Sequence, residues 1–355
     1  MNITSEQVLS ALSNVEDPDL KKDLVSLNMI KDLVINGREI NFTLELTTPA
    51  CPMKDMLKNA CINAVKHFVD ADANINIQVT AKVTQSLNQS NLAEIKNIIL
   101  VSSGKGGVGK STVAGNLAVS LASNGAKVGI LDADIYGPSI PMMFDLQDEK
   151  PGAKELENGK VVILPPEKYG VKVLSLGFFA DPNQPVPWRG PMASSAIKQL
   201  FNDADWGALD YLIVDLPPGT GDIHITITQG YPIAGAVIVT TPQEIALADT
   251  RKGLLMFQMP GMNVPILGVV ENMSYFTPPE LPENKYYIFG KDGGKKLAET
   301  FNVPFLGEIP LMETITEGGD KGNPVALMPD SIQGKAFLDI AGKVAQQVAI
   351  RNAGE

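Results

Sequence analysis

Hydrophobic positions follow two different patterns along this chain of 355 residues. In the first 83 residues apolar and polar side chains alternate, so that Ile40, Phe42, Leu44 and Leu46 are separated by polar positions, as in a strand with one buried face. A helix is predicted after the residues TTPACPM, and a second alternating run at 75–79 closes the segment. This part of the sequence predicts a small α+β domain over residues 1–83.

From residue 98 onward the apolar residues form short continuous runs instead. These runs lie at 98–101, 128–131, 212–214, 237–239 and 266–270. Continuous runs are typical of strands that are buried on both faces, and the segments between them are long enough for helices. We therefore predict an α/β domain over residues 96–355, with a mostly parallel sheet and helices on both faces. Residues 84–95 are polar and lack periodicity, which indicates a linker.

Composition and charge narrow the classes of partner. The chain is 44% hydrophobic and 19% charged, as in ordinary globular proteins, and its formal net charge is -11. An acidic chain without a basic block is not expected to bind nucleic acid or anionic membranes. We see neither a signal-peptide pattern nor a run of 18 apolar residues, so we expect a cytoplasmic protein.

The segment VSSGKGGVGKST at 101–112 carries the strongest chemical signal. Gly104, Gly109, Lys110 and Ser111 match G-x-x-x-x-G-K-[ST], and the segment follows a predicted strand and precedes a predicted helix. Glycines let backbone N–H groups surround phosphate oxygens, Lys110 neutralises β- and γ-phosphate charge, and Ser111 offers its hydroxyl to Mg²⁺. We predict a phosphate-binding loop.

Acidic residues follow two other predicted strands. Asp132 and Asp134 come after the run at 128–131, and Asp215 comes after the run at 212–214. A carboxylate at the end of a strand can hold the magnesium shell, which is the role we expect for Asp215. In the following LPPGTGD, Gly219 has an amide that we expect to be free to approach a γ-phosphate.

Four motifs together resemble one family. GKGGVGKS, LDADIYGPS, VDLPPGTGD and ENMSYF are similar to the Mrp/ApbC family of P-loop ATPases, in the class that includes the ParA and MinD proteins. The resemblance covers residues 96–330. Residues 1–83, with LTTPACPMKD, resemble a small domain shared with iron-sulfur assembly factors.

The resemblance implies a role for the second lysine of the loop. In this class Lys105 marks a deviant Walker A motif, and it reaches across a nucleotide-sandwiched homodimer to phosphates held by the partner. The resemblance further implies that Asp134 orients the attacking water, that Asp132 and Asp215 serve Mg²⁺ together with Ser111, and that Asn272 recognises adenine. The residues expected to contact ATP are Gly104, Lys105, Gly106, Gly107, Val108, Gly109, Lys110, Ser111, Thr112, Gly219 and Asn272.

The family pattern breaks at the cysteines. Many members carry a C-x-x-C pair after ENMS that is thought to hold a [4Fe-4S] cluster between two chains, whereas this chain has no cysteine beyond Cys61. Cys51 is the remaining candidate ligand, because a following helix N-terminus lowers the pKa of a thiol; an inert, half-buried Cys51 is an equal alternative. We expect Cys61 to be a core residue, and His67 and His224 to be structural or surface residues.

These observations leave three functions open. The first is a homodimeric, slowly hydrolysing Mg-ATP-dependent ATPase that binds or transfers iron-sulfur clusters to apoproteins or assists their assembly. The second is a nucleotide-switched adaptor of the same fold without a cluster of its own. The third is a positioning ATPase of the ParA/MinD kind, against which the acidic charge speaks.

Overall fold

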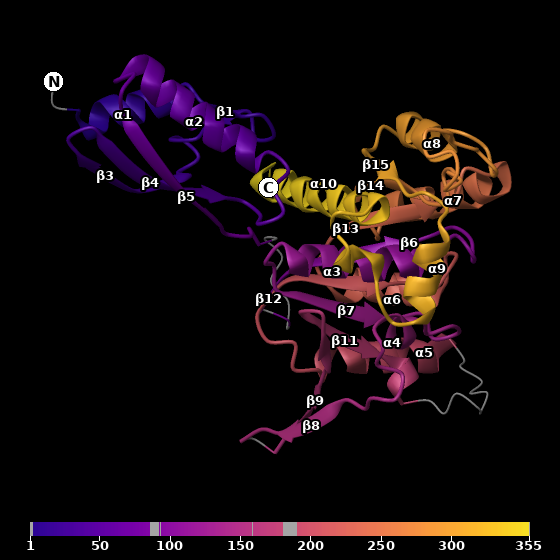
Figure 1. Ribbon diagram of the computed structural model, residues 1–355. Coiled ribbons are helices and arrows are strands. Elements are labelled where there is room, and N and C mark those ends of the chain that lie inside the picture. The colour runs from indigo at the N-terminus through magenta and orange to yellow at the C-terminus, as the bar shows by residue number, and fades with distance from the viewer. Residues whose placement is uncertain (1–2, 86–91, 93, 158, 180–189, 355) are drawn as a thin grey trace. The chain divides into compact units, whose positions relative to one another are not determined.

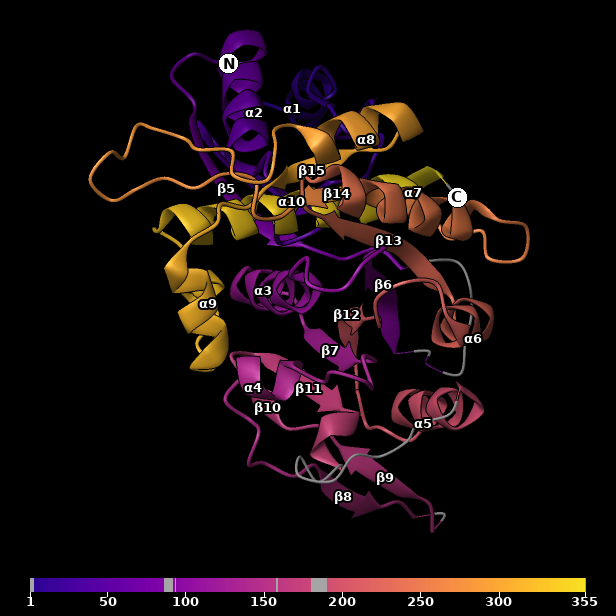
Figure 2. The ribbon, with the colours of Figure 1, turned by 90° about the vertical axis from the view of Figure 1, so that its right-hand side faces the viewer.

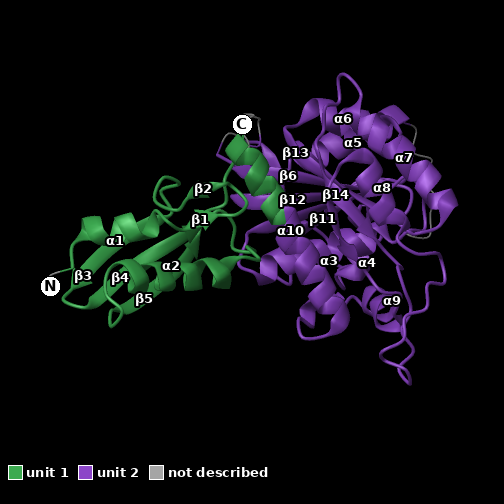
Figure 3. Cartoon of the chain, turned by 90° about the horizontal axis from the view of Figure 1, so that it is seen from above, with its two compact units in different colours: residues 1–85, 345–355 green, residues 86–344 purple. Residues whose placement is uncertain are grey.

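The computed structural model describes residues 3–85, 92, 94–157, 159–179 and 190–354. The chain divides into two compact units (Figure 3): unit 1 contains residues 1–85 and 345–355, and unit 2 contains residues 86–344. Residues 86–91 and 93 of the expected linker lie outside the described residues. The domain boundaries expected from the sequence stay a prediction.

Unit 1 is built on a three-stranded sheet with two helices (Figure 1). The sheet order is β3-β4-β5, with β3 and β4 antiparallel and β4 and β5 parallel. The four alternating residues of the central strand, Ile40, Phe42, Leu44 and Leu46, are at most 3% exposed and pack with both helices in one core, as predicted. The elements are α1 (Ser5–Leu12), β1 (Glu16–Asp17), β2 (Lys22–Asp23), β3 (Ile30–Asn36), β4 (Glu39–Leu46), α2 (Lys54–Phe68) and β5 (Asn74–Ala81).

Unit 2 contains an eight-stranded sheet. Its order is β10-β11-β7-β12-β6-β13-β14-β15, and only the edge pair β10 and β11 is antiparallel. All five apolar runs form strands of this sheet, which confirms the predicted mostly parallel α/β fold. The strands are β6 (Ile95–Ser102), β7 (Val128–Asp132), β10 (Glu167–Lys168), β11 (Val171–Ser175), β12 (Leu209–Asp215), β13 (Ile233–Thr240), β14 (Ile266–Glu271) and β15 (Phe305–Glu308), beside a separate hairpin of β8 (Gly152–Glu155) and β9 (Val161–Leu164).

Helices cover both faces of the unit 2 sheet (Figure 2): α3 and α4 lie on one face, and α5, α6 and α7 lie on the other. Val113, Leu117 and Leu121 of α3 are fully buried, as their spacing predicts. The helices are α3 (Lys110–Ser123), α4 (Ile140–Met143), α5 (Gly190–Asn202), α6 (Asp222–Gly230), α7 (Glu244–Gln258), α8 (Gly293–Phe301), α9 (Glu313–Asp320) and α10 (Ile332–Gly354), of which α10 belongs to unit 1 from Ala345 onward; 3₁₀ turns lie at Leu176–Phe178 and Val325–Leu327. No helix in the described part of the chain is long and apolar enough to cross a bilayer.

The strand order places a topological switch point beside β6, at the carboxyl ends of the strands. The chain leaves β6, passes through α3 and returns as β7, which is separated from β6 by the later strand β12, whereas β13 pairs with the other side of β6. Connections therefore diverge around β6, and the loops after β6, β7 and β12 open at the same carboxyl edge. Open α/β sheets bind ligands at such a switch point.

Candidate nucleotide site

The glycine-rich loop occupies residues 103–109, between the end of β6 and the first residue of α3. Gly107 and Gly109 have left-handed backbone angles, with φ of 80° and 78°. A β-carbon at Gly109 would lie 2.2 Å from Nδ2 of Asn272, and one at Gly104 would lie 2.2 Å from the carbonyl carbon of Asp249 in α7. The loop is thus pressed against two other elements, and side chains at these glycines would force it away from them.

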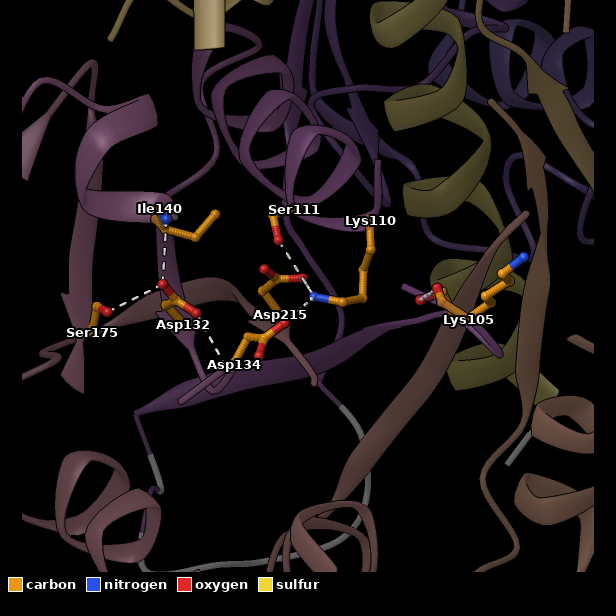
Figure 4. A network of polar contacts seen from close by, with 9 residues as sticks. Lys105, Lys110, Ser111, Asp132, Asp134, Ile140, Ser175 and Asp215 are labelled. Atoms are coloured by element: carbon orange, nitrogen blue, oxygen red, sulfur yellow. Dashed lines mark hydrogen bonds and ion pairs between the residues drawn. The ribbon is translucent and has the colours of Figure 1, made fainter. Parts of the chain in front are cut away.

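Lys110 is the centre of a buried charge cluster (Figure 4). Its Nζ lies 2.7 Å from Oδ1 of Asp215, 3.5 Å from Oδ2 of Asp134 and 3.4 Å from Oγ of Ser111. The side chain of Lys110 is 6% exposed and that of Asp215 is fully buried. The structure therefore brings four predicted site residues, from α3 and from the ends of β7 and β12, together around one ammonium group.

Asp215 has capacity for a further ligand. Burial raises the pKa of its carboxyl, and the neighbouring Lys110 ammonium opposes that rise. Its second oxygen, Oδ2, is buried and has no hydrogen-bond partner among the described residues. A buried, unpaired carboxylate oxygen near a serine hydroxyl suits Mg²⁺, which in nucleotide sites takes one or two protein oxygens and completes its shell with phosphates and water.

Asp132 is differently placed. Its Oδ1 accepts a hydrogen bond from the N–H of Asp134, and its Oδ2 accepts from the N–H of Ile140 and from the hydroxyl of Ser175 (Figure 4). Burial, followed by the charge of Asp215, raises the pKa of Asp132. Through these three hydrogen bonds Asp132 holds the loop after β7 in place. Its contact with Mg²⁺ stays a prediction.

The loop after β12 lies against the glycine-rich loop. The N–H of Gly219 donates to the carbonyl of Ser103 at 3.0 Å, so the expectation of a free amide is wrong for this arrangement of the loop. The start of the glycine-rich loop places the carbonyl of Ser103 opposite this N–H, which the sequence did not indicate. Gly219 has a φ of 89° and open space around it, and its approach to a γ-phosphate stays a prediction that requires this hydrogen bond to break.

Two predicted residues lie outside the charge cluster. Lys105 is partly exposed, its amine points away from Lys110, and it forms no ion pair within the described ranges (Figure 4). Asn272 is buried, and its Nδ2 donates to the carbonyl of Val108 at 2.8 Å. Asn272 therefore supports the glycine-rich loop directly, and its recognition of adenine stays a prediction.

A cavity of about 240 Å³ lies along the glycine-rich loop. Besides predicted residues it is lined by Ser103, Ser139, Met143 and Pro218, which the sequence analysis did not assign. Ser139 and Pro218 lie within the quoted motifs LDADIYGPS and VDLPPGTGD, so the motifs themselves held this signal.

Cys51, in unit 1, does not have the environment expected for a reactive thiol. Burial raises its pKa, and the carboxylates of Asp19 and Asp17 add to the rise, so the expected lowering by the helix is wrong. The α2 helix begins only at Lys54, and the thiol borders a cavity of about 10 Å³, room for one water molecule at most. Cys61 is fully buried in the core, as expected.

The segment 275–286, which begins within ENMSYF, is held by a backbone bridge and by an aromatic contact. Phe276 pairs with Tyr286, and Nζ of Lys285 lies 3.8 Å from the ring centroid of Tyr275. Within the described residues, no group of three or more His, Cys, Asp or Glu side chains is arranged to hold a metal ion.

The fold and the site define a P-loop NTPase with an additional lysine in its loop. A family model described as NUBPL iron-transfer P-loop NTPase, of the ParA type, matches residues 94–345, and one described as iron-sulfur cluster assembly protein matches residues 5–79. The chain belongs to the NUBPL iron-transfer P-loop NTPase family, which confirms the family that the four motifs indicate.

Curated relatives and a solved structure agree with this assignment. The chain is 50% identical to an iron-sulfur cluster carrier protein of Synechocystis over 98% of this chain and 99% of the relative. It is 44% identical to the chloroplastic Fe-S cluster assembly factor HCF101 of Arabidopsis thaliana over 98% of this chain and 64% of that protein. The ADP complex of a nucleotide-binding protein from Archaeoglobus fulgidus is 38% identical, covers 68% of this chain and 92% of that one, and has a TM-score of 0.58.

Proposed function

We propose that this chain is a homodimeric ATPase that serves iron-sulfur cluster transfer or assembly. The observation that carries the proposal is the buried contact between Lys110 and Asp215 at the end of the glycine-rich loop. The relatives named as cluster carriers and assembly factors support the role that we assign to ATP turnover.

The charge cluster suggests how the protein binds ATP. In the structure, Lys110 is neutralised by Asp215 and approached by Asp134. We propose that, when ATP binds, β- and γ-phosphate oxygens replace Asp215 as the partners of the Lys110 ammonium. Both oxygens of the Asp215 carboxylate are then available. Asp134 then lies beside the phosphates, where it can orient the attacking water.

Ser111 and Asp215 are the residues that we propose for Mg²⁺, and Asp132 supports them by fixing the loop after β7. Mg²⁺ held there would neutralise the charge that develops on the phosphates. Lys105 is available for the nucleotide of a second chain because it points away from its own cluster (Figure 4). An additional cation at the phosphates accelerates hydrolysis in the way that an arginine finger does.

The cluster is cargo rather than a resident cofactor in this proposal. Cys51 is the single cysteine that is not enclosed in the core, and its raised pKa and small cavity suit a cluster poorly. This observation favours a second candidate function, a nucleotide-switched adaptor that assists cluster assembly without holding a cluster.

Two assays on the same protein separate the candidates. ATP hydrolysis is measured with wild type and Lys110→Ala, and anaerobic iron-sulfur reconstitution is measured with wild type, Cys51→Ala and the matched core variant Cys61→Ala, as iron and sulfide per chain. ATPase activity with Cys51-dependent cluster binding supports the carrier. ATPase activity with no bound cluster supports the adaptor, and absence of Lys110-dependent hydrolysis refutes both.

A further inference from the structure

Gly104, the first glycine of the phosphate-loop motif, lies directly against helix α7. A β-carbon at Gly104 would lie 2.2 Å from the carbonyl carbon of Asp249 and 2.4 Å from the backbone nitrogen of Thr250. One turn further along α7, a β-carbon at Gly253 would lie 3.9 Å from both N and Cα of Gly104. Backbone faces backbone in this contact, so neither side can give way by turning a side chain. The position of α7 therefore fixes the position of Gly104.

Lys105 follows this contact directly. Its carbonyl accepts a hydrogen bond at 2.9 Å from the hydroxyl of the buried Ser103, so its backbone is held between that bond and the contact of Gly104 with α7. The ammonium of Lys105 points away from Lys110 (Figure 4). A lysine side chain is flexible, so the region that its ammonium can reach is set by where its backbone is held.

The contact is fixed at Thr250, whose side chain is buried and whose backbone nitrogen faces Gly104. The Thr250 hydroxyl donates to the carbonyl of Ala246 at 2.7 Å and is hydrogen-bonded to the hydroxyl of Thr240 at 3.0 Å. Thr240 is the last residue of β13. The pair of hydroxyls therefore joins the middle of α7 to the end of a strand of the sheet.

Thr250 differs in kind from the rest of the buried face of α7. The other buried residues of this helix are apolar, namely Ala246, Leu247, Gly253, Leu254, Met256 and Phe257. Apolar contacts have no preferred direction, and packed helices can slide slightly past such contacts. A hydrogen bond requires a defined distance and angle. Thr250 thus fixes α7 along and around its axis at the residue that touches Gly104.

Thr240 also supports the other end of the glycine-rich loop. Its carbonyl accepts a hydrogen bond at 2.8 Å from the N–H of Asn272, and Nδ2 of Asn272 donates to the carbonyl of Val108. The support by α7 at Gly104 and the support by Asn272 at Val108 therefore start from the same residue of β13. The loop is held relative to the sheet at both of its ends.

We propose that Thr250 is a positioning residue of Lys105: its hydroxyl, paired with Thr240, holds the backbone of α7 against Gly104 and thereby sets the place from which the Lys105 side chain leaves the loop. This inference rests on the proposed function, in which Lys105 serves the nucleotide of a second chain. Thr250 has no contact with nucleotide in this proposal. Removing its hydroxyl therefore acts on turnover through Lys105, and not on the binding of ATP to its own chain.

The test compares ATP turnover in Thr250→Val, in Lys105→Ala and in the double variant. Valine keeps the shape of threonine without the hydroxyl, so we expect kcat to fall about tenfold through displacement of Lys105, with KM for ATP within about twofold of wild type. In the double variant kcat should equal that of Lys105→Ala alone, because the residue through which Thr250 acts is missing. If the tenfold loss and the loss of about 10²-fold expected for Lys105→Ala were independent, they would multiply to about 10³-fold.

Two further variants separate positioning from packing, with Tm measured for every variant. Thr250→Ser keeps the hydroxyl and loses a methyl group, so kcat should return close to that of wild type. Thr226→Val is the matched control, because Thr226 of α6 also forms a hydroxyl–hydroxyl bond of 3.0 Å, to Ser194 of α5. This control should leave kcat unchanged. The reverse order at position 250, with Thr250→Val near wild type and Thr250→Ser impaired, would identify a packing residue.

The outcomes distinguish this inference from the proposed function. If the wild type shows no Lys110-dependent hydrolysis, the proposed function fails and the inference fails with it. If Lys105→Ala turns over ATP as fast as wild type, the contact across two chains and the inference are both wrong. If Lys105→Ala lowers kcat but Thr250→Val does not, or if the double variant shows the multiplied loss, the inference alone is wrong.

Discussion

The glycine-rich loop of unit 2 and the Cys51 region of unit 1 both carry a residue predicted to bind a ligand, yet their surroundings differ. Around Lys110, carboxylates and a hydroxyl from three elements converge on one ammonium, and Asp215 retains an unpaired oxygen. Around Cys51, carboxylates face a thiol whose ionised form would carry the same charge, and the adjacent space is about 10 Å³. The first region is arranged for an incoming ligand, whereas the second holds a partly buried thiol beside carboxylates that disfavour its ionised form.

The difference shows what a motif specifies. A phosphate-binding loop fixes several residue types at set spacings, and each spacing imposes a backbone geometry. A single cysteine after a strand imposes none, so its neighbours decide its chemistry. Burial raises the pKa of the Cys51 thiol, and the carboxylates of Asp17 and Asp19, which are distant in sequence, add to that rise.

Lys110→Ala should have the largest effect, because it removes the charge on which the first region depends. We expect ATP turnover to fall about 10³-fold. We also expect a loss of about 3–5 kcal/mol in unfolding free energy, since Asp215 is left buried without its cation. Turnover by phosphate release and stability by urea denaturation measure the two effects.

A double variant separates these effects. Lys110→Ala with Asp215→Ala should regain much of the stability but none of the turnover. Lys160→Ala is the matched control, because Lys160 pairs with Asp203 at 3.0 Å on the exposed surface. If Lys110→Ala behaves like this control, the charge cluster is not a nucleotide site.

Lys105→Ala should lower turnover about 10²-fold while leaving stability within about 0.5 kcal/mol of wild type, because Lys105 is partly exposed and points away from the cluster. Sedimentation with a non-hydrolysable ATP analogue measures the accompanying loss of dimer. Unchanged turnover and unchanged dimer formation would remove the proposed contact across two chains.

Asn272→Ala distinguishes support of the loop from recognition of adenine. The loss of the bond to Val108 leaves a buried carbonyl unpaired, so we expect stability to fall by about 1–3 kcal/mol and turnover of ATP and GTP to fall by the same factor. A loss confined to ATP, in parallel assays with both nucleotides, would favour the adenine role instead.

Much of the fold could be predicted because its strands are strongly patterned. The continuous apolar runs gave β6, β7, β12, β13 and β14, and alternation gave β4 and β5. The hairpin of β8 and β9 and the edge strand β10 were not predicted, because they are short and mostly exposed and so lack a periodic apolar signal.

The candidate site also contains positions that could be predicted from the sequence and contacts that could not. The positions of Lys110, Ser111, Asp134 and Asp215 follow from strand ends that meet at one edge of the sheet. The hydrogen bonds of Gly219 to Ser103 and of Asn272 to Val108 do not follow, because they join loops whose approach depends on packing. The sequence did not show whether His224 is buried, because a single histidine among apolar residues can lie on either face of a helix.

The smallest expected effect concerns the thiol of Cys51, and it tests whether this thiol is available as a cluster ligand. Because the folded-state pKa of Cys51 lies above its ordinary value, the thiolate is disfavoured at pH 8, and its alkylation by iodoacetamide should be slower than in the unfolded chain. The sign for stability follows: the folded protein retains the proton that the unfolded chain loses, so this thiol's contribution to stability falls as pH rises above about 9.

Alkylation rates measured from pH 7 to 10 in Cys61→Ala report Cys51 alone. The same rates in Cys51→Ala report the core thiol Cys61, whose pKa is raised to about 12 and which should react more slowly still. Alkylation of native Cys51 as fast as that of the unfolded chain at pH 7 would show an accessible thiolate, and it would return Cys51 to the ligands available for a cluster.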